Sequence, residues 1–341
     1  GQIRRQRQMC IRDRIKKRST AEAVLSELKD KHPLPELILS YRKLYKLKNT
    51  YLDPLPSYIV ADTKRVHSSF NQTMTATGRL STSSPNFQNI PIRTEDGKEI
   101  RKAIKAQSNE YQIFSADYSQ VELRVMAHLS GDESLISALN NGEDIHTFTA
   151  KNIFNVDNDD MVLPEMRRIA KIVNFGIMYG AGPFRLSQEL DIPFGEAKQI
   201  KDAYFQKYRG IEQYIENSKL QIKETKSVET LLGRKRAVWD SDSQNKIRRD
   251  AAERMAINMP IQGTAAEMIK LAMIKIHRQM NKENLKSKLI MQIHDELLLE
   301  VHQDEIDYIS KMVIEHMRNA MKLDVPIEID FGIGPSWYEA H

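Results

Sequence analysis

Two apolar, strand-like runs that each lead into a carboxylate constrain this chain more than any other feature. The first run, residues 111–116, leads into Asp117, and the second, residues 289–293, is followed within two residues by Asp295. A carboxylate at the end of a strand is held on a rigid element and stays open to solvent, which suits a metal-binding residue. Two such carboxylates from distant segments can converge on a pair of divalent ions, an arrangement that serves phosphoryl or nucleotidyl displacement.

A third block, residues 167–180, has the spacing of a helix that carries cations and aromatic rings on one side. Arg167, Lys171, Phe175 and Tyr179 are four residues apart. Each step of four advances only about 40° around a helix, so the four side chains share one face. Two cations followed by two aromatic rings suit a nucleoside triphosphate. The alternative is an amphipathic helix with a basic solvated edge and an aromatic stripe that faces the core.

In this order the three blocks resemble the polymerase motifs of the family A DNA polymerases, the bacterial DNA polymerase I type. The resemblance runs from about Ser19 to His341 and includes residues 75–81 and 85–91. It implies an α+β, right-hand polymerase fold in which an antiparallel palm sheet carries a mainly helical fingers insertion. The implied domains are a partial thumb at 19–57, a palm at 58–132 and 246–341, and fingers at 133–245.

The resemblance implies template-directed addition of dNTPs to a primer 3′-hydroxyl with release of pyrophosphate. Asp117 and Asp295, helped by the carbonyl of Tyr118, are then expected to bind two Mg²⁺ ions, which prefer hard oxygen ligands. Mn²⁺ is expected to substitute for Mg²⁺. Glu296 is expected to be a catalytic neighbour on the primer side rather than a ligand. Without the other blocks, an Asp-Glu pair in a turn would indicate a solvated hairpin.

The same resemblance assigns residues to an incoming nucleotide. Lys171 and Arg167 are expected to bind the triphosphate, and Lys171 is also a candidate proton donor to the pyrophosphate leaving group. Phe175 is expected against the sugar and Tyr179 beside the templating base. The remaining expected contacts are Gln120, His146 at the β-phosphate, and Glu122, which would crowd a ribose 2′-hydroxyl.

Two of these residues also have simpler interpretations. A single histidine such as His146 is more often structural than functional. The carboxylate of Glu122 could cap its helix or pair with Arg124.

Polar side chains in several blocks are expected to contact primer–template DNA. Asn and Gln can donate to the minor-groove acceptors that all correct base pairs share, whereas cations near the N-terminal helices would contact phosphates. The alternative for the Asn- and Gln-rich loops is plain turn chemistry. The expected DNA contacts are Arg79, Asn86, Gln88, Asn89, Arg93, Arg254, Asn258, Gln262, His294, Lys46, Lys48 and Asn49.

The charge of the chain is concentrated at its beginning. Residues 1–18 hold eight Arg or Lys and one acid, Asp13, so residues 19–341 carry about −2 of the net +5. Residues 9–14 can be encoded by a sequence that resembles the end of a sequencing-library transposon. We therefore hypothesise that residues 1–18 are non-native, and the alternative is a disordered basic tail that touches DNA.

Other features indicate the class of protein. Cys10 is the only cysteine, which excludes an intramolecular disulfide and suits a reducing compartment. The N-terminus is too basic for a signal peptide, and no apolar run is long enough to cross a bilayer. A soluble, cytoplasmic monomer without a membrane partner is expected.

Local patterns predict where the helices lie. Helical periodicity covers residues 20–48 with a break near Pro33, and a helix is expected over 120–130. Residues 133–260 are expected to be mainly helical, residues 261–280 to form another helix, and a final helix to run through Lys322.

Two rival functions remain open from the sequence alone. A single-subunit RNA polymerase shares the two-Asp plan, but Glu122 argues against it because that side chain would exclude the 2′-hydroxyl. A DNA-binding fragment without catalysis is the second rival, because the earlier helices of the thumb are absent from this chain.

Overall fold

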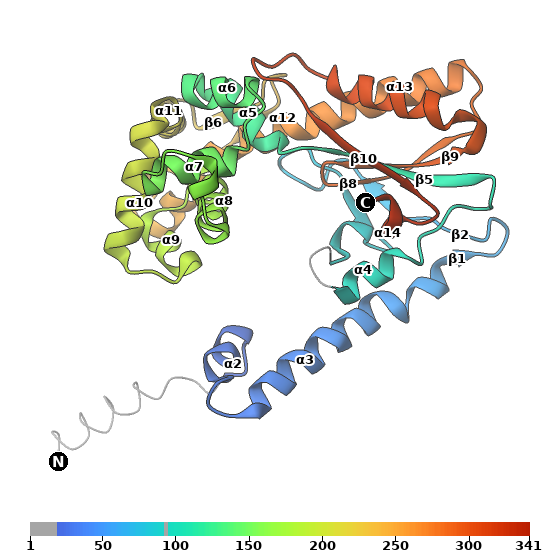
Figure 1. The fold of residues 1–341 in the computed structure, drawn as a ribbon, viewed down its shortest axis with the longest axis horizontal. Helices are drawn as coiled ribbons and strands as arrows, with labels where there is room; N and C mark the ends of the chain where they lie inside the picture. Colours follow the sequence, from blue (N-terminus) through green and yellow to red (C-terminus); the bar gives the residue numbers. More distant parts are fainter. Residues whose placement is uncertain (1–18, 92–94) are drawn as a thin grey trace. The chain divides into compact units, whose positions relative to one another are not determined.

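The computed structural model describes residues 19–91 and 95–341, which form two compact units (Figure 1). One unit contains the residues up to Ser68 together with Ile90–Ile100, and the other comprises Ser69–Asn89 and Arg101–His341. Both the basic segment 1–18 and Arg93 lie outside the described residues.

The first unit is built around one long helix. His32 accepts a hydrogen bond from the N–H of Leu34, and Pro33 occupies the first turn, where its missing N–H costs nothing. The predicted break near Pro33 is therefore confirmed. The elements of this unit are α2 (Glu22–Leu28), α3 (Pro33–Leu47), short helical turns at Lys48–Leu52 and Leu55–Tyr58, β1 (Ile59–Val60), β2 (Arg65–Val66), and all but the last residue of α4 (Glu95–Arg101).

The second unit contains a four-stranded sheet in the order β10-β5-β9-β8, in which every neighbouring pair is antiparallel. The expected α+β class and the antiparallel sheet are confirmed. The strands are β5 (Tyr111–Tyr118), β8 (Lys288–Ile293), β9 (Glu296–His302) and β10 (Ile329–Gly334).

Alternate residues of β5 face different partners because side chains of a strand point to opposite faces in turn. Phe114, Ala116 and Tyr118 belong to the main hydrophobic core, which also contains residues of α13 (Ile306–Arg318). The hydroxyl of Tyr118 donates to the carbonyl of Met317 at the end of that helix, 2.8 Å away. The intervening Asp117 therefore points to the other face, away from α13.

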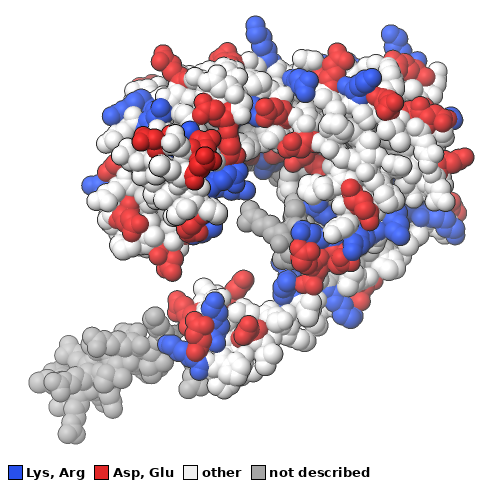
Figure 2. Space-filling model, in the orientation of Figure 1, with Lys and Arg blue, Asp and Glu red and all other residues white. Residues whose placement is uncertain are grey.

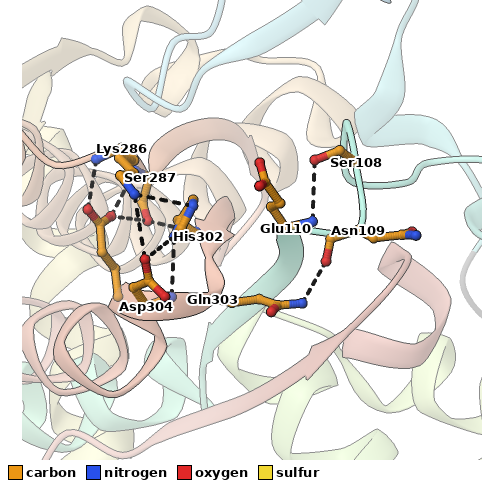
Figure 3. A network of polar contacts seen from close by, with 9 residues as sticks. Ser108, Asn109, Glu110, Lys286, Ser287, His302, Gln303 and Asp304 are labelled. Atoms are coloured by element: carbon orange, nitrogen blue, oxygen red, sulfur yellow. Dashed lines mark hydrogen bonds and ion pairs between the residues drawn. The ribbon is translucent and has the colours of Figure 1, made fainter.

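Polar contacts close the end of the sheet at which β5 begins (Figure 3). The backbone N–H of Gln303 donates to the carbonyl of Glu110 at 2.9 Å, and its side chain donates to the carbonyl of Asn109 at 2.6 Å. His302 accepts from the N–H of Asp304 at 3.2 Å. The two bonds from Gln303 tie the residues before β5 to the chain that follows β9.

Most of the remaining residues of the second unit are helical. Its other elements are β3 (Ser69–Asn71), β4 (Ser81–Ser83), α5 (Val121–Ser130), α6 (Glu133–Asn140), α7 (Ile145–Phe154), α8 (Pro164–Met178), α9 (Pro183–Leu190), α10 (Phe194–Lys207), α11 (Arg209–Thr225), β6 (Ser227–Glu229), β7 (Lys235–Ala237), α12 (Lys246–Lys282) and α14 (Trp337–Ala340), with 3-10 turns at Phe87–Asn89, Asp159–Met161, Trp239–Asp242 and Gln303–Glu305.

Two expectations for these helices are wrong. Residues 261–280 do not form a separate helix, because α12 continues through Pro260; Met259, Pro260 and Ile261 are all buried, and tertiary packing outweighs the lost backbone bond. The helix before Lys322 is not the final element either. It ends at Arg318 and is followed by β10 and α14, where β10 pairs with β5.

The surface of the described residues mixes both signs of charge. Figure 2 shows Lys and Arg side chains interspersed with Asp and Glu on the face in view. This mixture agrees with the small net charge of residues 19–341. None of the described helices has an apolar stretch long enough to span a bilayer.

Candidate active site

Two carboxylates meet where β5 ends and the β8–β9 hairpin turns. Asp117 is the penultimate residue of β5, and Asp295 lies in the two-residue turn between β8 and β9. His294 supports this tight turn with a positive φ of 51°. The N–H of Tyr118 donates to the carbonyl of Asp295 at 3.2 Å, which ties the turn to the end of β5. The structure therefore brings together the two residues that the sequence predicts as ligands.

Negative charge accumulates around this pair. Burial raises the pKa of Asp117 to about 7, and the neighbouring carboxylates of Glu296 and Asp295 add to the rise. Burial also raises the pKa of Asp295, although Arg79, whose Nη2 lies 3.8 Å from its Oδ1, opposes that shift. Within the described residues no group of three or more His, Cys, Asp or Glu side chains is arranged to hold a metal ion. The donor set is thus a carboxylate pair, open to further ligands from a substrate.

Glu296 lies directly opposite Asp117 in the register of β5 and β9. Its Oε1 accepts from the hydroxyl of Ser115 at 2.6 Å and from the indole N–H of Trp337 at 2.8 Å. Burial by itself raises the pKa of Glu296, but hydrogen bonds from His341, Ser115 and Trp337 hold it below its ordinary value. Glu296 is therefore an ionised neighbour of the pair with its own donors.

Glu122 contacts one predicted DNA-binding residue, Arg79, and one predicted nucleotide-binding residue, Tyr179. Its Oε1 lies 2.5 Å from Nη2 of Arg79, and its other oxygen accepts from the hydroxyl of Tyr179. Burial raises the pKa of Glu122, and these two partners oppose the rise. The alternative in which Glu122 pairs with Arg124 is wrong, because Arg124 instead donates to Glu328 and to two backbone carbonyls.

The predicted cationic face lies on α8. Arg167 donates twice to Asp144, at 3.1 and 2.7 Å, and Asp144 caps the N-terminus of α7. Burial alone would raise the pKa of Asp144, but the bonds from Arg167 and from the N–H of Thr147 lower it to about 2. Lys171 is exposed and forms no ion pair with any described residue. Lys171 is therefore the more available cation for an anionic ligand.

His146 is buried behind α8. Its Nδ1 lies 3.1 Å from Nδ2 of Asn174, an amide donor, so the proton of the neutral ring is assigned to Nε2. Its ring centroid is 5.8 Å from that of Phe175. Burial lowers the pKa of His146 to about 4, so this ring is neutral at pH 7.

The buried, neutral state of His146 predicts a pH dependence of stability. The unfolded chain protonates this residue near pH 6.5, whereas the folded chain does so near pH 4. The stabilisation is thus complete above pH 6.5 and is lost as the pH falls to about 4, a change of about 3 kcal/mol. Denaturant unfolding at pH 7 and pH 4.5 should show a larger loss for the wild type than for His146→Gln. Equal losses in both proteins would contradict this interpretation.

The predicted DNA contacts fall into several groups. Arg254, Asn258 and Gln262 are partly exposed and four residues apart on α12, and Oδ1 of Asn258 is buried without a hydrogen-bond partner among the described residues. Gln88 donates to Oε1 of Gln292 at 3.3 Å.

The other predicted DNA residues are placed as follows. Asn86 accepts from Thr82 at 2.8 Å, Asn89 ends the short turn that follows, and His294 is exposed beside Asp295. Lys46, Lys48 and Asn49 belong to the first unit, where Lys48 pairs with Asp53 at 2.5 Å. Gln120 takes a left-handed conformation immediately before α5, and its carbonyl accepts from the N–H of Leu123.

Three side chains around the site are missing from the sequence predictions: Ser115, Trp337 and Arg101. Ser115 and Trp337 bind Glu296, and the guanidinium of Arg101 lies over the ring of Trp337. Apolar residues alternate at Ile329, Phe331 and Ile333, and this alternation could have revealed the strand that precedes Trp337. No local signal points from Arg101 to Glu296.

Comparison with known proteins gives a consistent set of similarities. The model of a family described as DNA polymerase family A matches residues 4–339. The match begins earlier than the start near Ser19 that the sequence suggests. A solved structure of the POL domain of Pol1 from M. smegmatis, in complex with DNA primer-template and dNTP, has a TM-score of 0.90 and 43% sequence identity. That similarity covers 94% of this chain and 57% of that chain.

Two curated relatives are similar along nearly the whole chain. The thermostable DNA polymerase I of Thermus filiformis is 50% identical over 324 residues, which are 95% of this chain and 38% of the relative. DNA polymerase I of Bacillus subtilis (strain 168) is 47% identical over 322 residues, 94% of this chain and 36% of the relative. The chain therefore spans less than two fifths of the length of these relatives.

Proposed function

Because this chain belongs to DNA polymerase family A, we propose that it holds the site of a template-directed DNA polymerase. This site adds dNTPs to a primer 3′-hydroxyl and releases pyrophosphate. The partners are primer–template DNA and dNTPs, and the protein acts as a cytoplasmic monomer. In this proposal residues 58–132 and 246–341 are the palm, residues 133–245 the fingers and residues 19–57 part of the thumb.

The observation that carries the proposal is the meeting of Asp117 and Asp295. They come from segments far apart in the sequence, and the 3.2 Å hydrogen bond from Tyr118 to the Asp295 carbonyl holds them side by side. A pair of carboxylates with a purely structural role would be neutralised by close cations. Here Nη2 of Arg79 lies 3.8 Å from Asp295 but only 2.5 Å from Glu122, so the charge of Asp295 is only weakly compensated.

The carboxylate pair fits divalent cations of the Mg²⁺ type. Carboxylate and carbonyl oxygens are the hard ligands that Mg²⁺ prefers, and the raised pKa of Asp117 reflects negative charge that a cation would relieve. Asp117, Asp295 and the carbonyl of Tyr118 would hold two ions, or Mn²⁺ in their place. When bound, these ions would acidify the primer hydroxyl and stabilise charge that develops on the α-phosphate.

The cationic face of α8 supports a triphosphate site beside this pair. Lys171 is exposed and free to meet phosphate oxygens, and it is a candidate proton donor to the leaving pyrophosphate. Arg167 would exchange its two hydrogen bonds to Asp144 for two to a phosphate, since a guanidinium group binds carboxylates and phosphates in the same bidentate way. His146 is neutral with its proton on Nε2, so it would donate a hydrogen bond to the β-phosphate without adding charge.

The position of Glu122 supports a choice of deoxynucleotides over ribonucleotides. Arg79 and Tyr179 hold its carboxylate from two sides, so it cannot swing away without breaking both contacts. A fixed carboxylate beside the sugar would crowd a 2′-hydroxyl. In the same proposal Phe175 packs against the sugar, Tyr179 lies by the templating base, and Gln120 completes the nucleotide pocket.

The partly exposed polar face of α12 supports contact with the base-paired duplex. Arg254, Asn258 and Gln262 can donate to minor-groove acceptors that do not depend on sequence. In the same proposal the DNA contacts also include Arg79, Asn86, Gln88, Asn89, Arg93, His294, Lys46, Lys48 and Asn49.

Replacing Phe175 by Tyr should relax discrimination against dideoxynucleotides. A phenolic hydroxyl on this face of α8 can supply the hydrogen bond that a missing 3′-hydroxyl leaves unmade. One such bond corresponds to roughly a tenfold to hundredfold change in the ratio of dNTP to ddNTP incorporation. Competition between ddTTP and dTTP on one template measures this ratio. An unchanged ratio would refute the sugar contact of Phe175.

Primer extension tests the proposed function as a whole. A short labelled primer–template is incubated with the protein and dNTPs, NTPs or no nucleotide, each with Mg²⁺ or with a chelator. We expect extension only with dNTPs and Mg²⁺. Extension with NTPs would indicate that the chain is an RNA polymerase. Duplex binding without any extension would support a DNA-binding fragment instead.

A further inference from the structure

The carboxylate of Glu296, next to the candidate ligand Asp117, is contacted by three other side chains. Only 3% of Glu296 is exposed, and its Oε1 accepts from Ser115 and from the indole N–H of Trp337. Nδ1 of the terminal residue His341 lies 3.5 Å from the same oxygen. Because paired residues of antiparallel strands share a face, Glu296 stands beside Asp117.

A buried guanidinium group, that of Arg101, packs against the indole of Trp337 that donates to Glu296. Arg101 is 2% exposed, and its guanidinium carbon lies 4.0 Å from the centroid of the Trp337 ring. Its Nε and Nη2 are buried and have no hydrogen-bond partner among the described residues. A buried charge needs compensation, and the groups that can supply it here are the face of the indole and the carboxylate of Glu296.

The backbone fixes the position of Trp337. Its N–H donates to the carbonyl of Ile104 at 2.9 Å. The helix α14 approaches β10 so closely that a Cβ on Gly332 would lie 2.5 Å from the carbonyl oxygen of Ala340. This close packing and the backbone bond to Ile104 hold Trp337 in place, and its indole N–H points toward Glu296.

We propose that Trp337 and Arg101 are positioning residues that act through Glu296 to fix its carboxylate beside Asp117 during nucleotidyl transfer. The proposal rests on the proposed polymerase function. Packing alone would need only an apolar ring at position 337, and Phe would satisfy it. The indole N–H and the buried guanidinium instead form a line of contacts that ends at a carboxylate opposite Asp117.

The first test is a double-mutant cycle between positions 337 and 296. Trp337→Phe keeps an aromatic ring at this position, although a smaller one, and removes the indole N–H, so we expect kcat for single-nucleotide addition to fall about tenfold to a hundredfold. The KM for dNTP and the Kd for primer–template should stay within about threefold, because the residue touches neither ligand. In a Glu296→Gln background the same change should cost no further activity. Additive losses, or an unchanged kcat, would overturn the proposal.

A second test does not depend on catalysis. The chain has two tryptophans, of which Trp239 is 77% exposed and Trp337 is fully buried. A Trp239→Phe variant therefore makes Trp337 the single tryptophan, which can be excited selectively over tyrosine, and we expect the variant to keep the wild-type activity. Adding Glu296→Leu, which leaves no oxygen to accept from the indole, should shift the Trp337 emission in the absence of DNA, nucleotide and metal. An identical spectrum would show that the contact is absent, whether or not the protein extends primers.

The role of Arg101 is tested by a conservative pair of variants. Arg101→Lys keeps the buried positive charge, whereas Arg101→Met keeps most of the volume without it. We expect the Lys variant to retain at least about tenfold more of the wild-type kcat than the Met variant. Equal losses would overturn the part assigned to the charge of Arg101.

If the wild-type chain extends no primer while Glu296→Leu shifts the Trp337 emission, the proposed function is wrong and the contact between Trp337 and Glu296 is supported. If the chain extends primers and the cycle is additive, only the positioning role fails.

Discussion

We expect the Asp117→Asn variant to add a single nucleotide at least about a thousandfold more slowly than the wild type. The change keeps the size of the side chain and its place in β5 but removes the charge that a divalent cation needs. Stability should not fall, because burial and the neighbouring carboxylates of Glu296, Asp295 and Asp330 raise the pKa of Asp117 and disfavour its charge. The rate is measured by rapid-quench addition of one dNTP at saturating nucleotide and DNA.

Asp330→Asn is the matched control for this experiment. Asp330 is paired with Asp117 across β10 and β5, and its side chain is exposed. It lies outside the candidate ligand set, so its loss should change the rate by less than about tenfold. Equal defects in the two variants would indicate a general effect of charge rather than a defined ligand pair.

Replacing Arg124 by Ala should lower the free energy of unfolding by about 3 kcal/mol. Arg124 is buried, and it donates to the carbonyls of Ser119 at 2.9 Å and Pro326 at 2.6 Å, and to the carboxylate of Glu328. These bonds tie the segment after Asp117 to the chain that leads into β10. The variant leaves two carbonyls without their donor, and denaturant unfolding measures the cost.

Arg209→Ala provides the comparison for Arg124. Arg209 is exposed and pairs with Glu212 on the same helix, at 3.2 Å. Exposed pairs of this kind contribute less than about 1 kcal/mol. If Arg124→Ala is no more destabilising than Arg209→Ala, the contacts of Arg124 do not hold the strand junction together.

The parts of the site that the sequence predicts correctly are those with a local pattern. Apolar runs before Asp117 and Asp295 predict the strands, and the spacing of four predicts the helix that carries Arg167 and Lys171. In both cases the periodicity of the backbone dictates which side chains share a face. The two carboxylates could be brought together only by the resemblance, since no local rule pairs β5 with β9.

The features that the sequence does not reveal depend on contacts between distant segments. The partners of Glu122 are 43 and 57 residues away, at Arg79 and Tyr179, and the nearby Arg124 is taken by Glu328. The continuity of α12 through Pro260 depends on packing around that residue, which local propensity cannot describe. The alternation of apolar residues at Ile329, Phe331 and Ile333 indicates a strand, but no local pattern shows that β10 pairs with β5.

The most direct test of the central claim is one single-turnover measurement that follows primer extension and pyrophosphate together. The wild type and Asp295→Asn are mixed with primer–template and one dNTP, with Mg²⁺ or with a chelator. We expect the wild type to release one pyrophosphate for each extended primer, only with Mg²⁺, and the variant to do neither. Extension by Asp295→Asn at the wild-type rate, or extension by the wild type without a divalent ion, would contradict a metal-dependent site at Asp117 and Asp295.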